Sequence, residues 1–318
     1  MLTKILVITP INHIDKLEDK LKKIGKLTIK AEPSNEYISK NIHKFEVVYT
    51  NPNKSNIFLG EKIIKKASKL KLICTASTGT NHIDVKYAEK NNIKIICLKD
   101  DFKTISKISS TAEHAFCLTL ASIRNLIPSF NSVKNGNWDY TKFIGRQMNF
   151  LTIGIVGYGR LGKMYSDYCK SFQSNILVYD PYKKIRSSKI NQVSNLNLLL
   201  KKSDIISFHI HINQNTHHLL NKKNIKNLKK NVTLINTSRG EIFDEKEIIS
   251  FLKKNKNAKL ACDVIENEIQ DKIKNPLIKF SKKSNQVIIS PHIGGMTKEA
   301  QNIAYHRVAD KLLNFLND

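Results

Sequence analysis

Short apolar segments of strand length alternate along this chain with segments in which apolar residues follow helical spacing. In the first third of the chain, the strand-length segments lie at residues 4–9, 46–49, 71–75 and 93–98. After the first of them, a spacing of three or four residues links Ile14, Leu17, Leu21 and Ile24. Alternation of strands with helices is typical of parallel sheets, so the pattern predicts an α/β unit.

A second series of strand-length segments follows, at residues 152–156, 175–180, 204–210, 232–237, 259–265 and 286–290. Between the two series, Ser110-Thr111-Ala112-Glu113 has the S-x-x-E pattern of a capping box, which predicts a long apolar helix through about Leu126. The last apolar residues, from Ala300 to Phe315, return to helical spacing. We therefore predict an α/β fold with two Rossmann/flavodoxin-like parallel-sheet domains, the second inserted between the first and its C-terminal helix.

The composition is that of a folded protein without a membrane-spanning segment. Of the 318 residues 41% are hydrophobic, and no apolar run reaches the roughly 18 residues that a membrane helix needs. The start of the chain carries Lys4 within a very short apolar run and lacks a small-residue cleavage site, so it is interpreted as a strand rather than a secretory signal. Five scattered cysteines without C-x-x-C spacing indicate neither a zinc site nor a disulfide framework. We expect a cytoplasmic protein with no membrane partner.

The formal net charge of +26 raises the question of a nucleic-acid partner. The lysines come as scattered pairs, and no aromatic stacking platform or helix-turn-helix pattern accompanies them. Lysine, asparagine and isoleucine are abundant together, as an AT-rich genome would encode. We therefore favour a solvated basic surface, which would attract anionic substrates, over a nucleic-acid-binding surface.

One glycine-rich segment carries more information than any other part of the chain. The apolar run that ends at Val156 leads directly into G-x-G-x-x-G at Gly157, Gly159 and Gly162, and Asp180 ends the next apolar run. In this dinucleotide-binding fingerprint the glycines allow a tight turn, a close approach of the pyrophosphate and close packing of the helix on its strand. The helix N-terminus attracts the phosphates, and an acidic residue at Asp180 accepts hydrogen bonds from the ribose. Its charge would repel a 2′-phosphate, so we predict NAD rather than NADP.

Three charged residues follow successive strands of the second series. These are Arg239, Glu268 and His292. Because the carboxyl ends of parallel strands meet at one edge of a sheet, we expect them beside the glycine loop. An arginine grips a carboxylate with two parallel bonds, a histidine passes a proton, and a nearby carboxylate orients the histidine and favours its charged form. Taken singly, each has an alternative: a surface salt bridge, a solvated acidic loop, or one of ten ordinary histidines.

The other histidines carry weaker signals. His209 and His211 follow a strand and are candidates for lining the cofactor. The rest are assigned to surface or core positions: His13, His43, His217, His218 and His306. No pair of histidines shows metal-ligand spacing with a carboxylate partner, so no metal site is predicted.

Several segments together resemble the D-isomer-specific 2-hydroxyacid dehydrogenase family, in particular its phosphoglycerate dehydrogenase branch. The resemblance covers nearly the whole chain and rests on the fingerprint and on segments 77–84, 110–114, 135–138, 236–240, 263–268 and 290–295. It implies a substrate (catalytic) domain at 1–105 and 293–318 and an NAD-binding Rossmann domain at 106–292. It also implies a homodimer, built mainly on the nucleotide-binding domain and its long helix from Ser110.

The resemblance further implies roles for individual residues. Arg239, Glu268 and His292 would be the catalytic set, and Ser77, Thr78 and Gly79 would bind the substrate together with Arg239. Asp263 would bind the carboxamide of NAD, and Thr237 would line the nicotinamide pocket. The full predicted set for the cofactor comprises Thr111, Gly157, Gly159, Arg160, Leu161, Gly162, Asp180, His209, Ile210, Thr237, Ser238, Asp263, Gly294 and Gly295.

The predicted function is hydride transfer between NAD(H) and a small 2-hydroxy or 2-oxo acid, with 3-phosphoglycerate as one candidate. Two departures from the family bear on this. Ile269 stands where a proline usually follows the catalytic glutamate, and the segment after Val48 offers Lys54 as its nearest cation for a substrate phosphate. The alternative is an NAD-sensing, corepressor-like binding protein without turnover.

Overall fold

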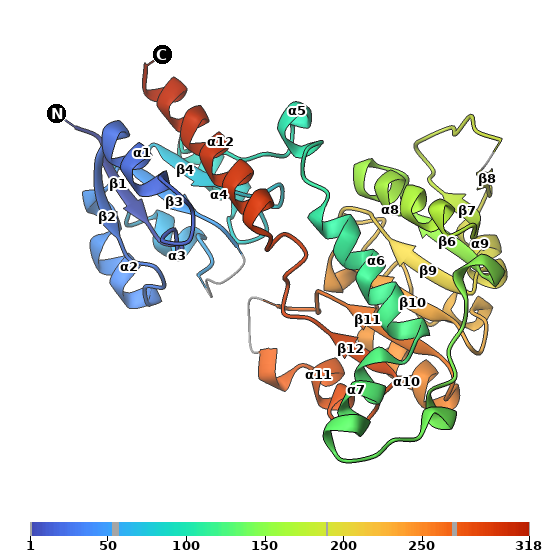
Figure 1. Cartoon of the computed structure of the whole chain (residues 1–318). Coiled ribbons are helices and arrows are strands. Elements are labelled where there is room, and N and C mark those ends of the chain that lie inside the picture. The colour runs from blue at the N-terminus through green and yellow to red at the C-terminus, as the bar shows by residue number, and fades with distance from the viewer. Residues whose placement is uncertain (1, 53–56, 189, 269–271, 318) are drawn as a thin grey trace. The chain divides into compact units, whose positions relative to one another are not determined.

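The computed structural model describes residues 2–52, 57–188, 190–268 and 272–317. The chain divides into two compact units, each with its own sheet (Figure 1). Unit 1 comprises Met1–Ile108 and Gly295–Asp318, and unit 2 comprises Ser109–Gly294. Among the described residues, all strand pairs of both sheets are parallel, so the predicted fold class of two parallel-sheet α/β domains is confirmed. Within the described residues, no helix is both long and apolar enough to cross a membrane.

Unit 1 contains a five-stranded sheet in the order β2-β1-β3-β4-β5, counted over the described residues. Its strands are β1 (Lys4–Val7), β2 (Lys26–Ile29), β3 (Val47–Thr50), β4 (Leu72–Thr75) and β5 (Lys94–Ile96). Its α-helices are α1 (Leu17–Ile24), α2 (Asn35–Asn41), α3 (Glu61–Ile64), α4 (Val85–Lys90), α5 (Phe102–Ile105) and α12 (Lys298–Asn317). The hydrophobic pattern alone missed β2, a half-exposed strand at the sheet edge.

The alternation of side chains along each strand gives unit 1 a core on both faces of its sheet. Ile5 of β1 packs in one hydrophobic cluster with residues of α1 and α12, whereas the next residue, Leu6, belongs to the cluster on the other face. Tyr305 ties α12 to the sheet, because its backbone carbonyl accepts a hydrogen bond from the Tyr49 hydroxyl at 2.6 Å. The C-terminal helix therefore completes the unit that the first 108 residues begin.

Unit 2 contains a seven-stranded sheet in the order β12-β11-β10-β9-β6-β7-β8, counted over the described residues. Its strands are β6 (Thr152–Val156), β7 (Asn175–Tyr179), β8 (Asn191–Gln192), β9 (Ile205–Phe208), β10 (Thr233–Asn236), β11 (Lys259–Cys262) and β12 (Val287–Ile289). Its α-helices are α6 (Ser110–Ile123), α7 (Leu126–Lys134), α8 (Arg160–Ser171), α9 (Leu196–Lys202), α10 (Glu245–Lys254) and α11 (Pro276–Ser281).

The chain of unit 2 runs outward from β6 through β7 and β8 and then returns to β9 on the other side of β6. That reversal is a topological switch point, where ligands of such sheets bind at the carboxyl ends of the strands.

Short 3₁₀ helices occupy several connections in the two units. They are η1 (Ile42–Lys44), η2 (Tyr140–Phe143), η3 (Met148–Phe150), η4 (Ile225–Asn227), η5 (Gly240–Ile242) and η6 (Lys272–Lys274). Of these, η5 begins directly after Arg239, so the arginine stands at the junction between β10 and a helical turn.

The first helix of unit 2 departs from the predicted cap and end. Helix α6 begins at Ser110, but the residue at its N-cap is Ser109, whose hydroxyl donates to the Glu113 carboxylate at 2.5 Å. The capping box assigned to Ser110 is therefore wrong, and the Ser110 hydroxyl is buried without a hydrogen-bond partner among the described residues. The helix stops at Ile123 because Asn125 adopts a left-handed backbone (φ 52°), and α7 starts afresh at Leu126.

Candidate active site

The glycine loop joins β6 to α8 at the switch point of unit 2. Gly157 has φ +89°, and a Cβ there would lie 2.5 Å from the carbonyl oxygen of His209. A Cβ at Gly162 would lie 2.1 Å from the carbonyl oxygen of Gly157, so the chain's own packing demands glycine at both positions. A Cβ at Gly159, by contrast, would meet no described atom within 4 Å. The space in front of Gly159 therefore suits a ligand that approaches the backbone closely.

The N-terminus of α8 adds an electrostatic reason for anion binding at this loop. The helix runs from Arg160 over 12 residues, and Gly159 at its N-cap has no side chain to cap the first amides. The amides of a helix N-terminus and the positive end of the helix dipole favour a phosphate group. The loop thus has the backbone shape and the positive electrostatic potential that a dinucleotide pyrophosphate requires.

Asp180 follows β7 and borders a pocket of about 550 Å³. Its two carboxylate oxygens accept hydrogen bonds from the backbone amides of Tyr158 (2.8 Å) and Tyr182 (2.9 Å). A carboxylate has about four lone-pair positions, so capacity remains for the hydroxyls of a ribose. Lys183 and Lys184 line the same pocket, so Asp180 supplies its negative charge beside two cations.

The ends of β9 and β10 lie next to the glycine loop. The Ser238 hydroxyl donates to the carbonyl oxygen of Phe208 at 2.6 Å and fixes one strand end to the other. The Thr237 hydroxyl is buried without a hydrogen-bond partner among the described residues. An orphaned buried hydroxyl beside an open glycine loop is an observation that a bound cofactor would explain.

His209 contributes its backbone rather than its ring to this region. The ring lies 5.0 Å from that of Tyr165, between centroids, and its Nε2 is 2.8 Å from the Ser207 hydroxyl. Burial lowers the pKa of His209 to about 3, so the imidazole is neutral at physiological pH. The carbonyl oxygen of His209 lies 2.5 Å from where a Cβ at Gly157 would stand, so the backbone of His209 helps to require glycine there.

Asp263, at the end of β11, organises the turn that follows β12. Burial alone would raise the pKa of its carboxyl group, but hydrogen bonds from His114, Ser290 and the amides of Ile293 and Gly294 outweigh that effect and lower the pKa. The two amides donate at 2.8 and 2.7 Å. The carboxylate is thus held charged and fully built into the 290–294 turn.

The three charged residues predicted as catalytic all follow neighbouring strands of the sheet. Arg239 follows β10, Glu268 follows β11 and His292 follows β12. His292 Nδ1 lies 2.7 Å from Glu268 Oε1, with both side chains about one-fifth exposed. Burial lowers the pKa of the Arg239 guanidinium, and the carboxylates of Glu268 and Glu241 partly offset that shift. The structure therefore brings together the trio that the sequence pattern singled out.

Two residues at or next to the His292–Glu268 pair have a left-handed backbone conformation. His292 has φ 56°, and Asn267, just before Glu268, also has φ 56°. Such conformations cost free energy in residues other than glycine and persist only where the surrounding structure imposes them. Here the hydrogen bonds of Asp263 impose the turn at His292.

A second buried carboxylate, missed by the sequence pattern, holds the loop that carries Glu268. Glu245 accepts a hydrogen bond from the Glu266 amide at 2.7 Å and another from the Asn275 side-chain amide at 2.8 Å. Burial raises the pKa of Glu245, although these hydrogen bonds oppose the shift. Glu245 stands in the first turn of α10, where acidic residues are common for reasons of helix stability alone, so nothing in the sequence distinguished it.

The segment predicted to bind substrate lies in unit 1, directly after β4. The hydroxyl of Ser77 donates to the Gly79 carbonyl at 2.7 Å and lies 2.9 Å from that of Thr75, which in turn is 3.0 Å from His82 Nε2. These contacts fix the loop around Thr78 from within. Two residues named in the sequence analysis, Lys54 and Ile269, lie outside the described residues.

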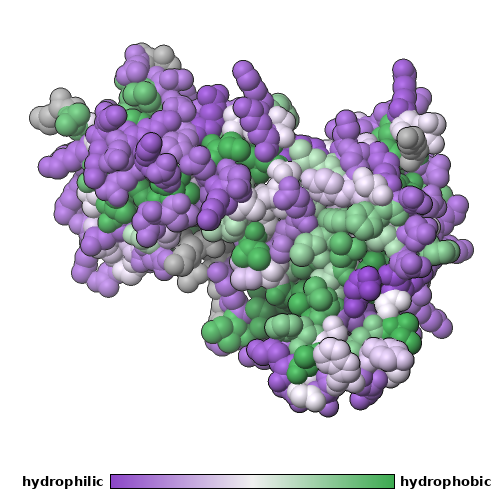
Figure 2. Space-filling model, viewed as in Figure 1, coloured by the Kyte–Doolittle hydropathy of each residue, from purple (hydrophilic) through white to green (hydrophobic). Residues whose placement is uncertain are grey.

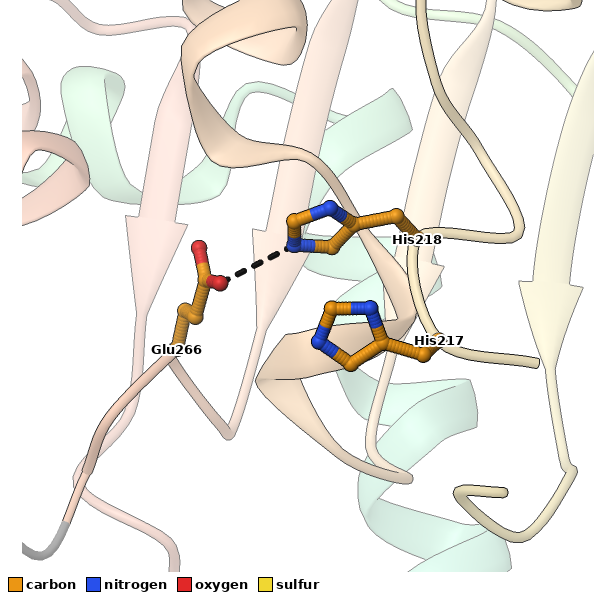
Figure 3. A group of neighbouring side chains, drawn as sticks. All are labelled: His217, His218 and Glu266. Carbon is orange, nitrogen blue, oxygen red and sulfur yellow. Dashed lines mark hydrogen bonds and ion pairs between the residues drawn. The ribbon is translucent and has the colours of Figure 1, made fainter. Parts of the chain in front are cut away.

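The structure corrects the view that no histidine pair meets a carboxylate. His217 and His218 lie beside Glu266, with ligand atoms within 4.8 Å of one another (Figure 3). The prediction failed because Glu266 is 48 residues away in the chain, and only the fold brings it to the two histidines.

The fold and the glycine loop together define a dinucleotide-binding protein of the Rossmann type. Residues 116–294 match the family model described as "D-isomer specific 2-hydroxyacid dehydrogenase, NAD binding domain". The chain therefore belongs to the D-isomer specific 2-hydroxyacid dehydrogenase family. The match lies within unit 2, which is the NAD-binding domain.

Individual relatives agree with this assignment. The chain is 32% identical over 318 residues to D-3-phosphoglycerate dehydrogenase of Methanocaldococcus jannaschii, covering 99% of this chain and 58% of that protein. It is 30% identical over 255 residues to hydroxypyruvate reductase of Thermotoga maritima, covering 80% of each. The structure of D-lactate dehydrogenase from Aquifex aeolicus, complexed with NAD and lactic acid, superposes with a TM-score of 0.84 at 26% identity, covering 99% of this chain and 96% of that one. The chain thus spans little more than half the length of the first of these relatives.

The different surroundings of the glycines lead to a prediction about cofactor binding. Gly159→Ala should leave the melting temperature unchanged, because the added methyl group meets open space. It should weaken NAD binding about tenfold or more, about 1.4 kcal/mol, because the methyl group occupies the approach of the pyrophosphate. Gly162→Ala should instead lower the melting temperature, since its methyl group meets backbone. Fluorescence titration with NADH and thermal melts of both variants check this, and unchanged NADH affinity in Gly159→Ala would contradict it.

Proposed function

We propose that this protein is a cytoplasmic NAD-dependent dehydrogenase that transfers hydride between NAD(H) and a D-2-hydroxy or 2-oxo acid. The observation that carries the proposal is the 2.7 Å contact between His292 and Glu268 at the strand ends beside Arg239. Bound NAD supplies the hydride acceptor, and its reduced form supplies the hydride donor. The chain's own residues then have to hold a carboxylate and move a proton.

Arg239 is suited to holding the carboxylate and carbonyl oxygen of the substrate. One of its Nη atoms donates to the Ser238 carbonyl at 2.6 Å, which fixes the side chain and leaves the other donors of the guanidinium for a ligand. A planar fork of donors matches a carboxylate with two parallel hydrogen bonds. In unit 1, the loop of Ser77, Thr78 and Gly79 would donate backbone amides to the same kind of group.

His292 is suited to moving the proton that accompanies hydride transfer. Its Nδ1 lies against Glu268, so Nε2 is the atom that would give a proton to the carbonyl oxygen in reduction and take it back in oxidation. The carboxylate of Glu268 fixes the orientation of the ring.

The remaining cofactor roles follow the same logic. We propose that the pyrophosphate lies at Gly159 and the first amides of α8, and that Asp180 binds the adenosine ribose. The other predicted contacts are Thr111, Arg160, Leu161, His209, Ile210, Thr237, Ser238, Asp263, Gly294 and Gly295. Of these, the hydroxyl of Thr237, which is buried with no hydrogen-bond partner in the described part of the chain, offers the most specific support for a bound group.

The identity of the substrate is best tested with a panel of acids. Relatives are named for 3-phosphoglycerate, hydroxypyruvate and glyoxylate, so these acids and their redox partners form the panel, with lactate and pyruvate added. We expect NADH oxidation with at least one 2-oxo acid and none with the His292→Ala variant. If NADH binds but no member of the panel is turned over, the protein is better described as an NAD-sensing binding protein.

Cofactor preference should depend on Asp180. Asp180→Ala should weaken NAD binding by about 1.5–3 kcal/mol, the range of hydrogen bonds to charged groups. NADP use should improve, because Lys183 and Lys184 then face a 2′-phosphate without an opposing carboxylate. Asp167→Ala, which removes an exposed carboxylate from α8, serves as the control. A wild type that prefers NADP, or a preference that Asp180→Ala leaves untouched, contradicts the assignment.

The partnership of Glu268 and His292 should appear in the pH–rate profile. Glu268→Gln keeps the shape of the side chain but removes the negative charge beside the imidazole. The limb of the profile for 2-oxo acid reduction should therefore move toward lower pH. The wild type, Glu268→Gln and the exposed control Glu36→Gln are compared side by side, and an unshifted limb would show that the two side chains do not act together.

We further propose a homodimer built on unit 2. Hydrophobic residues gather over α6 and α7 (Figure 2), and α7 leaves Leu126, Ile127, Phe130 and Val133 between 43% and 59% exposed. An exposed apolar face on a helix is typical of an interface.

Light scattering should therefore give about twice the 36.3 kDa mass of one chain. Phe130→Glu should shift the mass toward that of the monomer, since it places a charge in the apolar face. Phe102→Glu, at an even more exposed phenylalanine of unit 1, should not. A wild-type mass near 36.3 kDa at micromolar concentration would refute the dimer.

A further inference from the structure

Two histidines and a carboxylate come together outside the Arg239–Glu268–His292 group. His217 is exposed, and His218 and Glu266 are half-buried. Their ligand atoms all lie within 4.8 Å of one another. Figure 3 shows both imidazoles extending from one turn of the chain to the same side, toward Glu266.

An unusual backbone conformation accounts for this arrangement. Neighbouring residues of an extended chain direct their side chains to opposite sides. His218, however, has φ 47°, and its ring lies 4.1 Å from that of His217, centroid to centroid, with 31° between the planes. His218 Nε2 is also 2.9 Å from Glu266 Oε1. The left-handed residue thus presents two adjacent imidazoles to one carboxylate.

The turn that carries the histidines is fixed by its own hydrogen bonds. The His217 amide donates to the Asn213 carbonyl at 2.9 Å, and the His218 amide donates to the Glu241 carbonyl at 2.8 Å. The Asn221 side chain donates to the His218 carbonyl at 2.7 Å.

The carboxylate is held as firmly on the other side of the cluster. The Glu266 amide donates to Glu245, and the Glu266 carbonyl accepts a hydrogen bond from Asn275 at 3.2 Å. Both halves of the cluster are therefore positioned before any ligand arrives, which reduces the cost of binding.

We propose that His217, His218 and Glu266 bind a divalent first-row transition-metal ion, of which Zn²⁺ is the representative. Two imidazole nitrogens and one carboxylate oxygen form a ligand set that Zn²⁺ accepts, with water completing the coordination. Zinc bonds of about 2.0–2.1 Å place tetrahedral ligands about 3.4 Å apart, so the cluster must tighten slightly. The His217 ring is exposed, so no surrounding side chains of a packed core oppose this movement.

Metal binding would replace the hydrogen bond between His218 and Glu266. The ion would bridge the turn after β9 to the loop after β11, and so would bind the folded chain and not the unfolded one. The site therefore predicts a rise in melting temperature with Zn²⁺. This inference stands independently of the dehydrogenase activity.

The test is calorimetric titration of the full chain, without a histidine tag and stripped with EDTA, with ZnCl₂. One ion per chain should bind, and thermal melts should shift upward. His217→Gln and Glu266→Gln should each weaken binding about tenfold or more, a loss at least as large as that from outer-shell partners. In Glu266→Gln the amide can still hydrogen bond to His218, so its melting temperature in EDTA should stay near that of the wild type.

Two control variants separate this site from other ligands on the surface. His43→Gln removes an exposed histidine of unit 1, and Cys117→Ser removes an exposed free thiol. Both should keep the Zn²⁺ affinity of the wild type. No stoichiometric binding by the wild type, equal binding by His217→Gln and Glu266→Gln, or loss of binding in Cys117→Ser would each overturn the proposal.

Discussion

Two buried carboxylates hold the site together. Burying a carboxylate is costly unless hydrogen bonds compensate its lost hydration. Asp263 gains this compensation from the amides of Ile293 and Gly294, and Glu245 gains part of it from the amide of Glu266. The first arrangement fixes the turn that carries His292, and the second fixes the loop that carries Glu268. The 2.7 Å contact between those two side chains is thus the product of two independent anchors.

The glycines of the loop between β6 and α8 fall into two kinds: those required by the packing of the chain itself and one that leaves space for a ligand. Gly157 and Gly162 are required by neighbouring backbone, whereas the space at Gly159 is used by nothing in the described chain. If packing required all three glycines, folding alone would explain the motif. Packing does not require Gly159, so the glycine at that position indicates ligand binding.

The sequence predicted the parts of the molecule that follow from local pattern and sheet geometry. The parallel sheets, and the arrival of Arg239, Glu268 and His292 at neighbouring strand ends, followed from apolar runs and from the rule that such strands end at one edge. The edge strand β2 was not predicted, because its residues are exposed or half-exposed and show no pattern of buried positions. Two contacts were missed for another reason. The hydrogen bond of Glu245 to the Glu266 amide spans 21 residues of the chain, and the contact of His218 with Glu266 spans 48, and no local pattern encodes such contacts.

The loop after β11 has to direct two carboxylates, two residues apart, to different partners. Glu266 reaches His218 at 2.9 Å, and Glu268 reaches His292 at 2.7 Å. Asn267 between them adopts a left-handed backbone, and its amide donates to Glu241 at 3.2 Å. If both carboxylates faced His292, their mutual repulsion would raise the cost of the charged site. By pairing each with its own histidine, the fold keeps a single carboxylate against the imidazole that would carry the proton.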